Sequence, residues 1–171
     1  GTRPAAIALS PAGALSGVLS AAGTFNFTIA ATSANGFTGQ RAYMLSVLQA
    51  GQAITNMAAS PASPVFSQGG SFTVSASGGG SSAPVTFGVA SGSTSVCSAG
   101  GTNGSLISML STGTCTVQAN QAGDANYLAA AQQVLDVVIG KGPQTISISS
   151  VPPANPRVGG NYELVTVAGP S

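Results

Sequence analysis

The feature that most constrains the fold is an alternation of apolar and polar side chains with a period of two residues. Its clearest example places Cys115, Val117 and Ala119 on one face of a segment and polar residues on the other. This period is typical of a β-strand with one buried face, and no stretch shows the sustained 3.6-residue period of a helix. Short strands separated by glycine-, proline- and serine-rich turns predict an all-β protein built from sandwiches.

The strand and turn patterns divide the chain into three units. Residues 50–142 contain about seven strand patterns and are predicted to form one complete sandwich. Residues 1–49 carry the closing strands of another sandwich, and residues 143–171 carry the opening strands of a further one. Within the complete unit, residues 78–82 are predicted to form a flexible loop, and residues 128–132 could form at most one helical turn.

A set of apolar residues in the two end units is predicted to face a sandwich interior and to drive assembly. In the first unit, a turn at Asn35-Gly36 joins two alternating strands, because both residues tolerate positive φ. The predicted assembly residues are Phe25, Phe27, Ile29, Tyr43, Leu45, Ile146, Ile148, Tyr162 and Leu164.

Three short motifs recur in order along the chain. Gln52-Ala53-Ile54 returns as Gln144-Thr145-Ile146, Pro61-Ala62-Ser63-Pro64 as Pro153-Ala154-Asn155-Pro156, and Gly69-Gly70-Ser71-Phe72 as Gly159-Gly160-Asn161-Tyr162. An internal period of roughly 90 residues is the mark of a tandem array of domains. The C-terminal unit is therefore predicted to begin a domain of the same kind as the central unit.

The chain is almost uncharged, with four basic and three acidic residues among 171 and a net charge of +1. Soluble domains usually contain about 25% charged residues. Without a basic stripe, neither nucleic acid nor an anionic membrane surface is an expected partner. No apolar run is long enough to span a bilayer. Weak charge leaves two interpretations open, a neutral extracellular module or a subunit that assembles with its own kind.

The two cysteines, Cys97 and Cys115, are predicted to form one disulfide, which indicates an oxidising compartment. Neither lies in a C-x-x-C motif, and the chain contains no histidine, so the usual zinc-ligand sets are unavailable. No basic-then-apolar signal segment opens the sequence. We therefore expect either a mature, processed chain or a piece of a longer one.

Enzymatic activity and cofactors are not expected. A catalytic cysteine or serine would need a base, and no histidine is present. The acidic residues at positions 124, 136 and 163 form no evident pair, and the glycines at 78–80 lack the lysine and helix of a phosphate-binding loop. Catalytic and metal sites are thus predicted to be absent.

A few polar and aromatic residues allow more than one role. Asp124 and Asn126 could bind a cation through oxygen, although turn capping through Asx hydrogen bonds is the favoured interpretation. Tyr127 is a candidate for a tyrosine-corner anchor whose hydroxyl reaches the backbone. Asn26 and Asn103 begin N-glycosylation triplets.

Several segments together resemble known families. Residues 71–76, 113–117 and 121–127 resemble the tandem Ig-like repeats of large bacterial surface and extracellular proteins. Residues 9–17 with 22–28 are similar to the "putative-Ig" family of such proteins, which is related to cadherin-like sandwiches. The resemblance implies a secreted β-sandwich protein that serves as a spacer, stalk or adhesin segment. Family members often carry an acidic residue near positions 32–36, but this chain does not, so no calcium site is carried over.

In the "putative-Ig" family the opening half precedes the closing half, whereas here the closing half comes first. We therefore hypothesise that one copy's C-terminal strands complete the next copy's N-terminal half, which would give a fibre. Alternatively, adjacent repeats of the same parent chain supply the missing halves of a stalk. A third possibility is an adhesin whose loops at 78–83 or 99–104 bind a glycan or a host or cell-surface protein.

Overall fold

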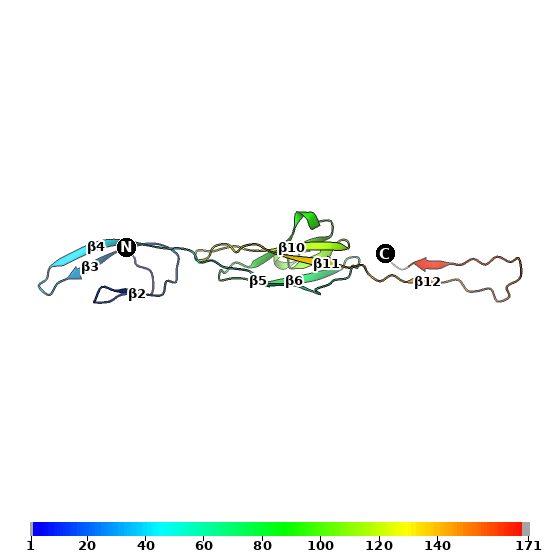
Figure 1. Ribbon diagram of the computed structural model, residues 1–171, viewed down its shortest axis with the longest axis horizontal. Coiled ribbons are helices and arrows are strands. Elements are labelled where there is room, and N and C mark those ends of the chain that lie inside the picture. Colours follow the sequence, from blue (N-terminus) through cyan, green and yellow to red (C-terminus); the bar gives the residue numbers. More distant parts are fainter. Residues whose placement is uncertain (1, 169–171) are drawn as a thin grey trace.

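The computed structural model describes residues 2–168, which contain thirteen strands and two short 3-10 turns. The all-β prediction is confirmed. Figure 1 shows an elongated arrangement, with a sandwich in the middle, two layers of strands at the N-terminal end and a ribbon at the C-terminal end.

The central part is a two-sheet sandwich of antiparallel strands. One sheet has the order β5-β6-β9-β8 and the other β11-β10-β7. In chain order the elements are β5 (Thr55–Ser60), β6 (Ser71–Ser77), β7 (Val85–Val89), η1 (Ser91–Ser93), β8 (Cys97–Gly100), η2 (Thr102–Gly104), β9 (Leu106–Met109), β10 (Gly113–Gln121) and β11 (Gln133–Ile139).

The core of this sandwich consists of the inward residues that alternation predicts. Cys115, Val117 and Ala119 on β10 are fully buried, while polar residues alternate with them. The opposing sheet contributes Phe72 and Val74 from β6. The remaining buried members of the cluster are Cys97, Ile107, Met109, Val137 and Ile139.

The N-terminal part consists of two hairpins. Strands β1 (Ile7–Leu9) and β2 (Leu15–Gly17) form one, and β3 (Gly23–Thr32) and β4 (Thr38–Val47) form the other. The predicted turn lies between β3 and β4, but the connection is longer than the two residues expected. The Phe37 amide donates to Ser33 Oγ, and only Gly36 adopts positive φ.

The C-terminal part is a two-stranded ribbon of β12 (Ile146–Ile148) and β13 (Thr166–Ala168). A turn between the strands is closed by a hydrogen bond from the Gly160 amide to the Arg157 carbonyl. Every residue of both strands is exposed. An isolated two-stranded ribbon is at best marginally stable in water.

One local prediction in the central part is wrong, and a second segment, for which at most one helical turn is expected, is extended. The loop at residues 78–82 is not free, because Gln121 Oε1 accepts a hydrogen bond from the Gly79 amide and Gln52 Oε1 accepts one from the Ser81 amide. Residues 128–132 are not helical. The Leu128 amide instead donates to the Ala50 carbonyl, which holds the segment beside the start of the sandwich.

Candidate functional site

Strands β3 and β4 present an apolar face, which we call the N-terminal face and define as Phe25, Phe27, Ile29, Tyr43 and Leu45. The antiparallel register places Phe25 opposite Leu45 and Phe27 opposite Tyr43. The Phe27 and Tyr43 rings stack with centroids 6.0 Å apart, and the Arg41 guanidinium lies 5.4 Å from the Tyr43 ring centroid. None of the five residues is fully buried, and Tyr43 is 42% exposed.

The β1–β2 hairpin forms a second layer against part of this face. Ile7 on β1 is buried, and a cavity of about 290 Å³ lies between the layers, lined in part by Leu9, Leu15 and Ile29. Figure 1 shows β2 below the β3–β4 hairpin. The N-terminal part therefore has two layers, as in a sandwich, with unfilled space between them.

The ribbon carries the second predicted set, which we call the C-terminal face and define as Ile146, Ile148, Tyr162 and Leu164. The β12–β13 register and the hydrogen bond from the Ser149 amide to the Val165 carbonyl place these residues at positions of the same parity. Tyr162 Oη lies 3.0 Å from Ser150 Oγ. All four apolar side chains are about half exposed or more.

The structure does not bring the two faces together. They lie at opposite ends of the elongated molecule, with the central sandwich between them (Figure 1). Their joint role in assembly stays a prediction, and any contact between them would join different copies or repeats.

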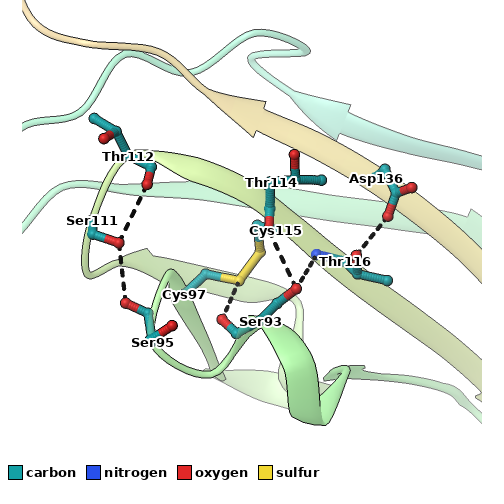
Figure 2. Close-up of a disulfide and its surroundings, with 9 residues drawn as sticks. All are labelled: Ser93, Ser95, Cys97, Ser111, Thr112, Thr114, Cys115, Thr116 and Asp136. Carbon is teal, nitrogen blue, oxygen red and sulfur yellow. Dashed lines mark hydrogen bonds between the residues drawn. A yellow bond between two sulfur atoms is a disulfide. The ribbon is translucent and has the colours of Figure 1, made fainter.

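The predicted disulfide between Cys97 and Cys115 is present, with the two Cα atoms 5.8 Å apart. It connects β8 in one sheet with β10 in the other (Figure 2). Ser93, which sequence reasoning missed, is buried beside it. Its Oγ donates to the Thr114 carbonyl at 3.2 Å and accepts from the Thr116 amide at 3.1 Å. This hydroxyl ties η1 to β10 next to the covalent link.

Asp124 and Asn126 organise a joint between the N-terminal part and the central sandwich. Asn126 Oδ1 accepts a hydrogen bond from the Ala22 amide at 2.9 Å. The Asn126 carbonyl accepts one from the Ala50 amide, and Gln49 Nε2 donates to the Asp124 carbonyl at 2.7 Å. We call these five residues the module joint. No chain-local signal predicts these bonds, because their partners lie far apart in the sequence.

The carboxylate of Asp124 caps its own turn, as the favoured interpretation predicts. Oδ1 accepts from the Asn126 and Tyr127 amides, and Oδ2 accepts from the Ser82 amide. The hydrogen bond from the Asn126 amide lowers the pKa of Asp124 below its ordinary value of 3.8, and the Ser82 and Tyr127 amides act in the same direction, while partial burial opposes them. Both oxygens are thus engaged by backbone donors.

Tyr127 acts differently from a tyrosine corner. Within residues 2–168, no hydrogen bond from its hydroxyl to the backbone is present. Its ring instead lies directly against Gly80, where any side chain would collide with it. Gln121, which sequence reasoning also missed, is buried and donates from Nε2 to the Ala83 carbonyl at 2.9 Å. The alternation places position 121 inward, but it does not reveal that a polar side chain there has partners.

The remaining candidates are placed as follows. Asn26 lies on the outward face of β3, and Asn103 is exposed in η2 with a φ of 54°. In the part of the chain that the structure describes, no group of three metal-ligating side chains is found. No helix among residues 2–168 is long and apolar enough to cross a membrane.

The comparison with known families gives a match at the N-terminal end of the chain. Residues 1–48 match the model of the family described as "Putative Ig domain". The match covers β1 to β4 and indicates a structural or adhesion-type Ig module, a class that is typically not enzymatic. No curated protein and no solved structure matches the chain.

Proposed function

We propose that this protein is a structural, non-enzymatic module of a bacterial extracellular stalk or head-to-tail fibre. In the assembly, the C-terminal ribbon of one unit completes the open N-terminal sandwich of the next. The neighbouring unit is another copy or an adjacent repeat of the same parent chain. Export fits the disulfide, which persists in oxidising compartments.

The observation that carries this proposal is the pair of exposed apolar faces at the two ends. Burying apolar surface is worth about 25 cal/mol per Å², so each open face gains stability when it is covered. Monomeric proteins rarely leave such surfaces and such strand edges open. Because the two faces differ, a contact between them joins one end to the other and repeats along a line.

The experiment is electron microscopy of the chain without denaturant or reductant, together with two matched variants. Phe27→Ser changes the N-terminal face, and Asn26→Ser changes the adjacent residue on the outward face of β3. We expect filaments for the unchanged chain and for Asn26→Ser, and dispersed particles for Phe27→Ser. Filaments that survive Phe27→Ser, or an unchanged chain that stays dispersed at every concentration, would overturn polymerisation.

One observation favours a second function, that of an adhesin segment. The stacked rings of Phe27 and Tyr43, with Arg41 beside them, form a partly exposed aromatic platform that a glycan ring could stack against. Of the two candidate binding loops, residues 78–83 are held by hydrogen bonds, whereas in the loop of residues 99–104 all residues except Gly104 are exposed. Glycan binding by dispersed particles, lost in Tyr43→Ser, would favour the adhesin.

A further inference from the structure

The central sandwich contains, within one chain, the strand pairings that the N-terminal and C-terminal parts each contain only in part. The C-terminal ribbon repeats its first hairpin in detail. In the centre, the Gly70 amide donates to the Ser67 carbonyl and Gly69 has a φ of 71°; in the ribbon, the Gly160 amide donates to the Arg157 carbonyl and Gly159 has a φ of 83°. The same turn therefore precedes β6 and the segment that leads into β13.

The strand pairing of the ribbon corresponds at one residue pair, next to the bulge that shifts the β5–β6 register between Thr55 and Ala58. Thr55 lies opposite Ser77 in the β5–β6 pair, and the equivalent residues Ser147 and Val167 lie opposite each other in the β12–β13 pair. Tyr162 then occupies the position of Phe72, which is 2% exposed in the centre. Tyr162 itself is 48% exposed.

The N-terminal part repeats the last strands of the same sandwich. Gly23 opens β3 with a φ of 140°, and Gly113 opens β10 with a φ of 139°. Phe25 pairs with Leu45 in the first case, and Cys115 pairs with Val137 in the second. The β3–β4 hairpin is thus the equivalent of β10–β11. The residues of the N-terminal face correspond to residues that lie in the core of the central sandwich.

The hairpin of β1 and β2 corresponds in turn to that of β8 and β9. It directly precedes β3, as β8 and β9 precede β10, and Ile7 pairs with Gly17 as Cys97 pairs with Met109. Ile7 and Cys97 are both buried. Leu15 on β2 then occupies the position of Ile107, which is fully buried, but Leu15 is 43% exposed.

In the central sandwich, β6 and β9 join the first hairpin to the later strands. Phe72 lies opposite Ile107 and Ser71 opposite Ser108, and the Met109 amide donates to the Gly70 carbonyl at 2.9 Å. Their equivalents in the end parts, β2 and residues 161–163, each have an edge with no strand paired to it among residues 2–168.

We propose that β2 of one copy pairs antiparallel with residues 161–163 of a second copy, with Leu15 opposite Tyr162 and Ser16 opposite Asn161. This inference rests on the proposed function and specifies its contact. In the resulting sheet, β12 lies beside the segment of residues 161–168, which ends in β13, and the start of that segment lies beside β2 and then β1. This order reproduces β5-β6-β9-β8 across two chains. Leu15 and Tyr162 become buried, and two open edges are satisfied by main-chain hydrogen bonds.

Disulfide trapping between two full-length variants tests this register. Opposite residues in an antiparallel pair have Cα atoms about 4.5–5.5 Å apart, which is within the range that a disulfide bridges. We expect Ser16→Cys mixed with Asn161→Cys to give a covalent heterodimer under mild oxidation. Ser16→Cys mixed with Glu163→Cys, which is two residues out of register, should give at least about tenfold less.

Mass spectrometry of the crosslinked peptides identifies the bond and separates it from the native disulfide. A central-sandwich variant with Ser71→Cys and Ser108→Cys provides the intrachain reference for the same geometry. Absence of the heterodimer, or an equal yield from the shifted pair, would overturn the proposed register. If the unchanged chain nevertheless forms filaments, only the register is wrong. If it stays dispersed, the head-to-tail fibre of the proposed function fails as well.

Discussion

At the residue scale, the stability of the module joint depends on one carboxylate with three backbone donors. Because the pKa of Asp124 is lower in the folded protein than its ordinary value of 3.8, the charged form favours folding. This contribution is fully present above the unfolded pKa and is lost as the pH falls through the folded pKa. The relevant window therefore lies below about pH 4.

We expect the unfolding temperature of Asp124→Asn to fall less steeply as the pH is lowered than that of the unchanged chain, because the variant has no carboxylate to protonate at this turn. Thermal unfolding followed by circular dichroism from pH 6 to pH 2 measures the effect. Asp136→Asn is the matched control, since that carboxylate accepts a hydrogen bond from the Thr116 side chain instead of from three amides. An acid limb in Asp124→Asn as steep as that of the unchanged chain would contradict the prediction.

A second prediction concerns Gln121, whose side chain holds the loop that the sequence suggests is flexible. Gln121→Leu keeps the volume but leaves the Gly79 amide and the Ala83 carbonyl without their partner. We expect the free energy of unfolding to fall by about 1–3 kcal/mol. Urea titration measures this loss. Gln118→Leu, which removes no side-chain hydrogen bond among those present, should change stability by less than about 0.5 kcal/mol.

At the scale of elements, the sequence predicts faces better than it predicts connections. Alternation identifies the inward residues of β6 and β10 correctly, because in a strand the side-chain direction follows from position alone. It also predicts that Phe25 and Phe27 share a face. It fails for the loop at residues 78–82, and it does not predict what holds the extended segment at 128–132. Both segments are held by residues distant in sequence, such as Gln52 and Ala50.

The candidate site shows the same division. The repeated motifs predict that the ribbon opens a new sandwich, and the apolar positions of both faces can be read from the sequence. The hydrogen bond from the Ala22 amide to Asn126 cannot be read from the sequence. It connects two units, and neither unit contains a sequence pattern that indicates it. For Tyr127 the sequence predicts a hydroxyl that reaches the backbone, whereas the structure shows its ring packed against Gly80.

The disulfide links the two sheets of the central sandwich, so its reduction should loosen them. It closes a loop with a sequence separation of 18 residues. The chain-entropy estimate for such a loop is about 3 kcal/mol. We expect the urea midpoint to fall accordingly when reductant is added to the unchanged chain. A variant with Cys97→Ala and Cys115→Ala should not respond to reductant, and an unchanged midpoint in the native chain would contradict the estimate.

At the scale of the whole molecule, the module joint connects the N-terminal part to the sandwich through Ala22, Gln49 and Ala50. We expect Asn126→Ala to speed hydrogen exchange at the Ala22 amide at least tenfold, because that amide loses its acceptor. The free energy of unfolding of the central sandwich should change by no more than about 1 kcal/mol. Amide exchange followed by NMR measures the first quantity and urea titration the second.

The matched control is Asn120→Ala, whose side chain accepts from Gln132 within the sandwich and does not touch the N-terminal part. Exchange at Ala22 should not respond to this change. Equal exchange in all three proteins would show that the joint bond does not hold the two parts together.

The position of the disulfide determines which contact would separate first if the proposed fibre or stalk were placed under tension. The Cys97–Cys115 bond prevents the residues between the two cysteines from being extended. Without the bond, this segment would add roughly 60 Å to the length of a fully extended chain. In the proposed shared sandwich the equivalent positions are Ile7 and Phe25, so no disulfide links its two sheets there. Under tension the shared sandwiches would separate first, leaving each central sandwich folded. When the force is released, the separated ends could pair again, so extension of the assembly would be reversible at the shared sandwiches.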